Sequence, residues 1–207
     1  MNVISQILQH KIVAIIRGAD PADVVKIAKA LHEGGIRILE VTFNSPNSIE
    51  VVNELSTRMK NELLIGMGTV LDAATAEKAI AAGARFIISP SFHVETIQTT
   101  RRLGAVSIPG AFTPTEIVNA FNSGGEIIKV FPTSGNVNYI KEIRAPLSHI
   151  PLMPTGGITL ENIKEFQKVG AVAFGVGTAL INTKEKITEE YLKKATERAE
   201  LFVRALN

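Results

Sequence analysis

The 207-residue chain carries 22 Lys and Arg against 20 Asp and Glu, a formal net charge of +2, and 45% of its residues are hydrophobic. This composition predicts a folded protein and lacks the clustered basic excess that nucleic-acid binding requires. The absence of cysteine excludes disulfides, thiolate metal sites and a cysteine nucleophile, and it fits a cytoplasmic location. No apolar stretch reaches the ~18 residues of a membrane span.

After a short amphipathic N-terminal helix, short apolar runs alternate with longer segments of helical pattern. The apolar runs are residues 12–17, 38–43, 63–69, 86–90, 106–111, 127–132, 152–156 and 173–178. Strands that alternate with helices form a parallel sheet, because a parallel crossover needs a helix-length connection. The pattern predicts one α/β domain over residues 1–207, a (β/α)8 TIM barrel. The alternative, an open doubly wound sheet, is disfavoured because residues 17–20 lack the Gly-x-Gly-x-x-Gly fingerprint.

Capping residues mark the helix boundaries. Asp20-Pro21 and Ser45-Pro46 predict helix starts, and Thr113-Pro114-Thr115-Glu116 predicts a capping box. Helix ends are predicted at Gly34, Gly83, Gly124 and Gly170. In a (β/α)8 barrel the active site lies at the carboxyl ends of the strands, so we look for chemistry there.

Lys129 is the only charge inside its apolar strand, and alternation places it on one face with Ile127 and Phe131. Burial disfavours the ammonium form, so its pKa should fall and the neutral amine become a nucleophile for a carbonyl carbon. The alternatives are a lysine that extends to solvent at the strand end and one held in a structural ion pair.

Glu40 is the lone charge of a second apolar strand, and alternation groups it with Thr42 towards the lumen. The apolar residues expected to face the helices are Leu39, Val41 and Phe43. Two lone charges near the carboxyl ends of two strands predict a catalytic pair, in which Lys129 forms a covalent adduct and Glu40 transfers protons.

Arg17 closes the first strand, where its guanidinium is suited to a carboxylate or a phosphate. Gly156-Gly157 ends the seventh strand, and Gly177-Thr178 ends the eighth. Phosphate sites of (β/α)8 barrels are often built from these two loops, so both motifs together predict a phosphate site. No cluster of metal ligands emerges, and we expect neither metal nor cofactor.

The chain resembles the family of 2-keto-3-deoxy-6-phosphogluconate (KDPG) and 4-hydroxy-2-oxoglutarate (KHG) aldolases from about residue 12 to the C-terminal helix. The motifs that carry the resemblance are Ile15-Ile16-Arg17, Glu33-Gly34-Gly35, Leu39-Glu40-Val41-Thr42, Gly66-Met67-Gly68-Thr69-Val70-Leu71, Ile88-Ser89-Pro90, Ile108-Pro109-Gly110, Ile128-Lys129-Val130-Phe131-Pro132 and Pro154-Thr155-Gly156-Gly157-Ile158. The resemblance implies a (β/α)8 barrel, usually a homotrimer, with metal-free class I aldolase chemistry in carbohydrate metabolism (the Entner–Doudoroff pathway).

By this resemblance Lys129 is the Schiff-base lysine and Glu40 the proton-transfer group. Thr69 and Pro90 would line the pyruvate-binding end. The residues implied to hold the phosphate are Gly156, Gly157, Gly177 and Thr178. The implied reaction cleaves KDPG to pyruvate and glyceraldehyde 3-phosphate, and KHG to pyruvate and glyoxylate.

One position departs from the family pattern. Many gluconate-type members carry an arginine two residues after the Glu-Val-Thr threonine, where this chain has Asn44. Arg17 then becomes the expected partner of the substrate carboxylate. The sequence Asn44-Ser45-Pro46 also resembles the 2-keto-3-deoxy-6-phosphogalactonate branch, so the substrate epimer stays open.

Two other functions stay open from the sequence. A phosphosugar isomerase or epimerase on the same barrel would keep the phosphate loops and Glu40 but need no adduct on Lys129. A non-catalytic binding or scaffold protein would use Lys129 and Glu40 as a structural pair.

Overall fold

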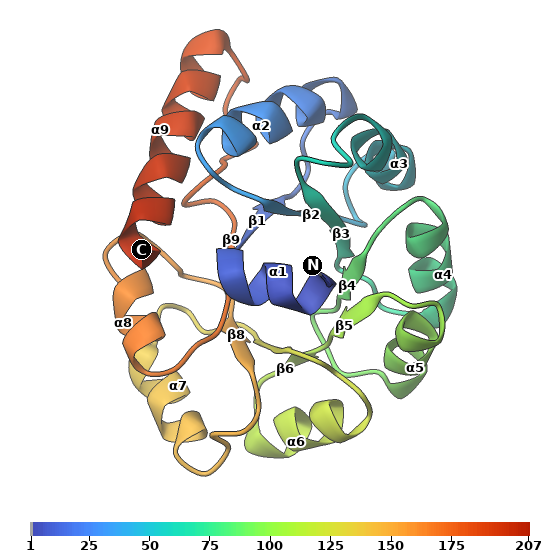
Figure 1. Ribbon diagram of the computed structural model, residues 1–207, viewed down its shortest axis with the longest axis vertical. Coiled ribbons are helices and arrows are strands. Elements are labelled where there is room, and N and C mark those ends of the chain that lie inside the picture. Colours follow the sequence, from blue (N-terminus) through green and yellow to red (C-terminus); the bar gives the residue numbers. More distant parts are fainter. Residues whose placement is uncertain (1) are drawn as a thin grey trace.

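The computed structural model describes residues 2–207 as strands that alternate with helices (Figure 1). The strands are β1 (Ile12–Ile16), β2 (Ile38–Thr42), β3 (Leu64–Gly68), β4 (Phe86–Ile88), β5 (Val106–Ile108), β6 (Gly110–Ala111), β7 (Ile128–Val130), β8 (Leu152–Pro154) and β9 (Phe174–Val176). The helices are α1 (Val3–His10), α2 (Pro21–Glu33), α3 (Ser48–Arg58), α4 (Ala73–Ala81), α5 (Val94–Arg102), α6 (Pro114–Asn122), α7 (Val137–Arg144), α8 (Ile163–Lys168) and α9 (Glu189–Leu206). The predicted α/β alternation and the N-terminal helix are confirmed.

All the strand pairs are parallel and belong to two sheets. Six strands form a curled sheet in the order β5–β4–β3–β2–β1–β9, and three form a second sheet in the order β6–β7–β8. Figure 1 shows the strands in the middle of the molecule and helices α2 to α9 around them. A parallel bridge pairs Thr155 with Gly175, and the Val172 N–H donates to the Leu152 carbonyl at 3.0 Å, so contacts also link the ends of the two sheets.

Buried side chains alternate between two apolar clusters. The outer cluster packs the strands against the helices and includes Leu39, Val41, Ile128 and Val130. The inner cluster, on the opposite face of the strands, contains Ile7, Val13, Ile38, Leu64, Phe86, Ile88, Val106, Ile108, Ile127, Met153 and Ala173. Because successive residues of a strand point to opposite faces, Lys129 shares the inner face with Ile127, and Glu40 shares it with Ile38.

Helix α1 covers the amino-end side of the inner cluster. Figure 1 shows α1 lying across the middle of the strands. Its Ile7 is fully buried and belongs to the inner cluster, whereas the next residue, Leu8, is 40% exposed. A side chain from outside the sheets therefore seals the inner face opposite the carboxyl ends of the strands.

The capping signals give most of the helix boundaries correctly. Asp20 caps α2, accepting from the Ala22 N–H at 2.9 Å, and Thr113 and Glu116 form the predicted capping box of α6. The four helix ends predicted by glycine are also confirmed.

The predicted helix start at Ser45-Pro46 is wrong, because α3 begins at Ser48 after Asn47. The Ser45 hydroxyl is engaged elsewhere. It lies 2.9 Å from the Thr42 hydroxyl and accepts from the Gly18 N–H at 2.8 Å. This serine therefore joins the loops after β1 and β2 instead of capping a helix.

Two strand predictions also need correction. The run 106–111 is divided into β5 and β6 at Pro109, which has no N–H to donate to a ladder. Phe43, predicted to pack towards the helices with Leu39 and Val41, is 38% exposed because β2 ends at Thr42.

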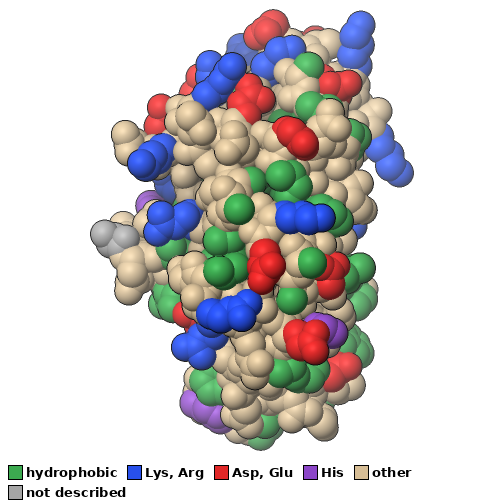
Figure 2. Space-filling view, turned by 90° about the vertical axis from the view of Figure 1, so that its right-hand side faces the viewer, with side chains coloured by type: hydrophobic (Ala, Val, Ile, Leu, Met, Phe, Trp, Pro, Cys, Tyr) green, Lys and Arg blue, Asp and Glu red, His purple; other side chains and the backbone are tan. Residues whose placement is uncertain are grey.

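The surface shows no single dominant charge on the face drawn in Figure 2, where acidic and basic side chains are interspersed among apolar ones. This pattern agrees with the net charge of +2.

None of the helices in residues 2–207 has both the length and the apolar character that crossing a bilayer requires.

The seal at Ile7 gives a test of the fold. Ile7→Ala should lower the free energy of unfolding by about 2–5 kcal/mol, because it leaves a cavity against the inner cluster. Leu8→Ala, one residue away and exposed, is the matched control and should change it by less than about 1 kcal/mol. Urea unfolding monitored by circular dichroism measures both, and equal losses would contradict the proposed seal.

Candidate active site

Lys129 lies in the middle of β7 and is 2% exposed. Its backbone N–H donates to the Pro109 carbonyl at 2.9 Å, which joins β7 to the start of the neighbouring strand β6. The Nζ atom lies 4.8 Å from the centre of the Phe131 ring. Burial, together with the positive charge of Arg17, lowers the pKa of Lys129 against the opposing effect of Glu40. A buried amine of lowered pKa reaches its neutral, nucleophilic form more readily.

Glu40 lies in the middle of β2 and is completely buried. Within the described residues, neither of its carboxyl oxygens has a hydrogen-bond partner, and it makes no ion pair of 4.0 Å or less. Burial raises the pKa of Glu40, while the charges of Lys129 and Arg17 oppose the rise. The carboxyl group is therefore buried and unpaired, and its raised pKa makes it more ready to hold and pass on a proton than an exposed glutamate.

Glu40 and Lys129 thus form a pair of titratable groups with opposite pKa shifts. Burial raises the pKa of Glu40 and lowers the pKa of Lys129, so it favours the neutral form of both. Their mutual attraction favours the charged forms, but no short ion pair between them is present in the described residues. This arrangement places an amine of lowered pKa and a carboxyl group of raised pKa on one inner face, which is suited to nucleophilic attack by the amine and proton transfer by the carboxyl group.

Arg17 follows β1 and is exposed, at the same carboxyl-end edge of the sheet. Its charge acts on the pKa of both Glu40 and Lys129, so the guanidinium lies near the pair without being buried with it. The Arg17 carbonyl accepts a hydrogen bond from the Thr183 hydroxyl at 2.5 Å. Asn44, two residues beyond the end of β2, is also exposed.

Thr69 and Pro90 follow the neighbouring strands β3 and β4, and both are half-buried. Thr69 has a φ of 58°, an uncommon value for a residue with a branched side chain. A Cβ atom on Gly110 would lie 2.3 Å from the Pro90 carbonyl carbon, so the backbones after β4 and in β6 are nearly in contact. Both predicted residues lie at the carboxyl ends of their strands.

The two predicted glycine loops are adjacent. Gly156 and Gly157 follow β8 with φ values of 92° and 74°, and the bridge between Thr155 and Gly175 holds this loop beside the end of β9. After β9, the Leu180 and Ile181 N–H groups both donate to the Gly177 carbonyl, which forms a helical turn. Exposed Thr178 lies at the amino end of that turn, a position that favours anions.

Sequence reasoning did not assign a role to the Thr155 side chain. Thr155 is 4% exposed, and its Oγ1 has no hydrogen-bond partner within the described residues. It lies two residues after Met153 of the inner cluster, so it belongs to the same face as Lys129. The signal was present, because Thr155 is a hydroxyl residue at the end of an apolar strand and opens the Gly156-Gly157 motif. The Thr133 hydroxyl donates to the Thr155 and Gly156 carbonyls at 3.0 and 2.7 Å and fixes this loop.

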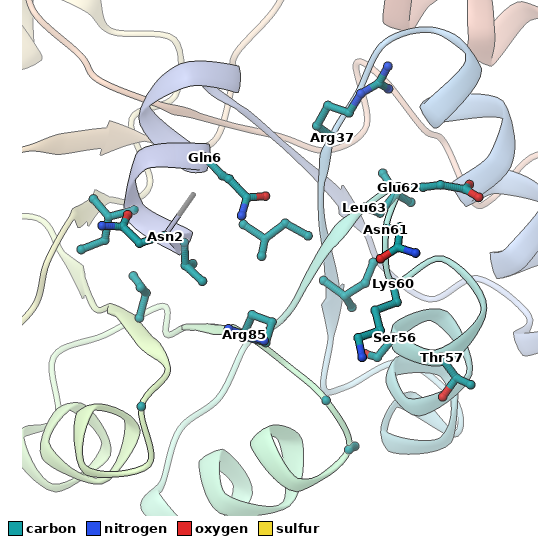
Figure 3. A pocket seen from close by; sticks show the side chains of 18 of the residues that line it. Asn2, Gln6, Arg37, Ser56, Thr57, Lys60, Asn61, Glu62, Leu63 and Arg85 are labelled. Carbon is teal, nitrogen blue, oxygen red and sulfur yellow. The ribbon is translucent and has the colours of Figure 1, made fainter.

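A hollow of about 1100 Å³ lies at the other end of the strands (Figure 3). Figure 3 shows Asn2, which caps α1, and Gln6 of α1 on one side of it, with Arg37, Lys60 and Arg85 around the rest. Arg37 and Arg85 precede β2 and β4, so the hollow is at the amino ends. Neither Lys129 nor Glu40 lines it, and it is separate from the candidate active site.

Residues 2–207 contain no group of three or more His, Asp or Glu side chains placed to hold a metal ion.

Comparison with known proteins identifies the family. The sequence model for KDPG and KHG aldolases matches residues 3–197. The chain is 36% identical over 146 residues to a 2-dehydro-3-deoxy-phosphogluconate aldolase of Treponema pallidum, covering 70% of this chain and 69% of the relative. It is 29% identical over 196 residues to the 2-dehydro-3-deoxy-6-phosphogalactonate aldolase of Escherichia coli K12, covering 94% and 93%. The chain belongs to the KDPG and KHG aldolase family.

A solved structure supports the same assignment. KDPG aldolase from Legionella pneumophila, with pyruvate captured at low pH as a covalent carbinolamine intermediate, superposes with a TM-score of 0.83 at 28% identity. The match covers 92% of this chain and 93% of the Legionella chain. The prediction of an aldolase, a carbon–carbon lyase, is therefore confirmed for this member of the KDPG and KHG aldolase family.

The charge state of the buried pair in this aldolase can be tested by removing the amine. Losing one partner of a buried ion pair costs about 3–5 kcal/mol, because it leaves an isolated buried charge. A neutral pair leaves no such charge, so Lys129→Met should not lower the free energy of unfolding at pH 7 by more than about 1 kcal/mol. The pKa of Lys129 is lower in the folded protein than in the unfolded chain. Between these two pKa values the unfolded chain holds the extra proton, so the free energy of unfolding of the wild type should rise with pH, relative to that of Lys129→Met.

Urea unfolding between pH 6 and 10 measures this difference. Lys168→Met, which removes an exposed lysine 2.7 Å from Glu165, is the control and should cost about 0–1 kcal/mol. A loss of 3 kcal/mol or more in Lys129→Met would show that Glu40 is ionised and depends on the ammonium.

Proposed function

We propose that this aldolase cleaves KDPG to pyruvate and glyceraldehyde 3-phosphate through a Schiff base on Lys129. The observation that carries the proposal is a pair of buried groups on one inner face, Lys129 and the unpaired Glu40, whose charges act on one another and whose pKa values are shifted in opposite directions. The covalent pyruvate carbinolamine of the Legionella pneumophila relative supports the same chemistry. Cleavage of KHG to pyruvate and glyoxylate is the corresponding reaction on an unphosphorylated substrate.

The first half of the reaction forms the electron sink. The neutral Lys129 amine attacks the C2 carbonyl carbon, and the carbonyl oxygen takes up a proton to give a carbinolamine. Loss of water, with a proton supplied by Glu40, leaves a protonated imine between Lys129 and C2. The positive nitrogen can accept an electron pair from the adjacent carbon, and this makes cleavage of a carbon–carbon bond possible.

The second half breaks that bond. Glu40 takes the proton of the C4 hydroxyl, C4 becomes the aldehyde carbon, and the electrons of the C3–C4 bond form the enamine on Lys129. Glyceraldehyde 3-phosphate leaves. A proton then returns to C3, and water hydrolyses the imine to pyruvate and the free amine. Glu40 can move each proton directly or through a water molecule.

The surrounding residues are proposed to orient the substrate. Arg17 would bind the carboxylate, because a guanidinium matches its two oxygens and no arginine stands at Asn44. Thr69 and Pro90 would line the pyruvate end. The adjacent loops after β8 and β9 would hold the phosphate, through backbone N–H groups at Gly156, Gly157, Gly177 and Thr178.

The 2-keto-3-deoxy-6-phosphogalactonate epimer is a second candidate substrate. Asn44 in place of arginine favours it, as does the likeness to the Escherichia coli phosphogalactonate aldolase. The two epimers share the carboxylate, the ketone and the phosphate, so the same Schiff-base steps apply to either. A comparison of kcat/KM for the two substrates decides between them.

We also propose that the two sheets complete a closed (β/α)8 barrel. Support comes from the short break at Pro109 between β5 and β6, and from the Thr155–Gly175 bridge between the regions of β8 and β9. The homotrimer, the cytoplasmic location and the Entner–Doudoroff pathway stay predictions from the family resemblance.

Borohydride trapping with pyruvate tests the Schiff base. Reduction should leave a stable adduct on Lys129, located by peptide mass spectrometry, and Lys129→Ala should abolish both adduct and turnover. Lys26→Ala, which removes an exposed lysine, is the control and should trap as wild type does. Folded protein that cleaves KDPG without forming an adduct would contradict the proposed Schiff base on Lys129.

Arg17→Gln tests the carboxylate partner. Removing a charge-assisted, two-pronged contact should raise KM for KDPG by roughly 10-fold or more, because such hydrogen bonds contribute about 1.5–3 kcal/mol. Arg58→Gln, an exposed helix arginine, should leave KM unchanged. If Arg17→Gln has a wild-type KM, another group binds the carboxylate.

A further inference from the structure

The inner face of β3 carries no side chain beside Glu40. Leu64 belongs to the inner cluster, so alternation places positions 66 and 68 on the same face, and both are glycine. Strand β2 pairs with β3 in parallel, with Glu40 opposite Gly66 and Thr42 opposite Gly68. The Glu40 side chain therefore lies next to a stretch of bare backbone.

The two glycines make room for different neighbours. A Cβ atom on Gly68 would lie 1.6 Å from Glu40 Oε1, 2.2 Å from Cδ and 2.6 Å from Cγ, and these are its three nearest atoms. A Cβ atom on Gly66 would instead lie 2.3–2.4 Å from the Phe86 ring. The Glu40 carboxyl group thus rests directly on the backbone of Gly68.

Backbone conformation does not explain the glycine at this position. Gly68 lies in a regular strand and lacks the positive φ found at Gly156 and Gly157. Any L-residue could adopt its backbone angles, so the requirement at position 68 is space alone.

We propose that Gly68 is a positioning residue, which provides the recess that keeps the Glu40 carboxyl group against β3 and apart from the Lys129 amine. This inference rests on the proposed roles of Glu40 and Lys129. The recess leaves the two groups unpaired, so a substrate carbonyl or a water molecule can come between them. Gly68 carries no reacting group of its own and acts only through Glu40.

The recess also bears on the charge of the pair. A methyl group at position 68 would push the carboxyl group off the backbone of β3, towards the inner space that Lys129 shares. A shorter distance to the amine favours the charged forms of both groups, which raises the pKa of Lys129. Less of the amine is then neutral at a given pH, and attack on the carbonyl slows.

Gly68→Ala is the direct test, with borohydride trapping of pyruvate on Lys129 measured from pH 5 to 10. The acid limb of the trapping rate should move to higher pH. The kcat for KDPG should fall on the order of 100-fold, the effect of a misplacement of about 1 Å, with KM changed less. Gly66→Ala is the matched control, because it is on the same strand and face but meets Phe86. It should lower thermal stability and leave the acid limb in place.

A double-mutant cycle separates positioning from general packing. Glu40→Ala removes the three atoms that the new methyl group would meet most closely, Oε1, Cδ and Cγ. Glu40→Ala and Glu40→Ala/Gly68→Ala should therefore have the same trapping rate and the same melting temperature, even if Gly68→Ala alone fails to fold. An equal loss on adding Gly68→Ala in both backgrounds would overturn the proposal. Absence of trapping in the wild type would instead refute the proposed function, so the two failures are distinguishable.

Discussion

Lys129 and Glu40 have lost nearly all contact with water, and no short ion pair between them replaces it. An ammonium or a carboxylate in such surroundings is costly, and a protein usually avoids the cost by pairing the charge or by neutralising it. Here burial acts on both groups at once and favours the amine and the carboxylic acid over their ions. The proposed nucleophile and the proposed proton carrier thus depend on the same constraint, exclusion of water from the inner face.

The strands impose this constraint through side-chain alternation. In β2 and β7 the residues on either side of the charged one pack into the outer cluster, so the charged residue has only the inner face available. Apolar residues fill that face towards the amino ends, and α1 adds Ile7 from outside the sheets. The carboxyl ends, by contrast, carry exposed Arg17, Asn44 and Thr178. The packed apolar side chains thus lie towards one end of the strands, and the residues proposed to bind the substrate lie at the other.

The elements could be predicted because each depends on local chemistry. Apolar runs and helix caps lie within a few residues of what they specify, and Lys129 and Glu40 stood out as lone charges in apolar strands. Features that depend on contacts distant in sequence were not predictable. Ser45 followed by Pro46 has the sequence pattern of a helix start, but the Ser45 hydroxyl accepts a hydrogen bond from the N–H of Gly18, 27 residues earlier. Likewise, the sequence showed Thr155 as a hydroxyl residue at the end of an apolar strand, but only the fold shows that its hydroxyl is buried without a partner.

The glycines of β3 show that the absence of a side chain can determine where a neighbouring functional group lies. A lone Gly-x-Gly in a sequence is usually attributed to a turn, and here the motif Gly66-Met67-Gly68 does precede a bend in the chain at Thr69. Its two glycines, however, lie within the strand and differ in what they make room for, an aromatic ring at Gly66 and a carboxyl group at Gly68. Packing densities in protein interiors leave few voids, so a side chain fits only where its neighbours lack atoms. The position of Glu40 is therefore set by β3 as much as by its own strand, a dependence that only the pairing of two strands makes visible.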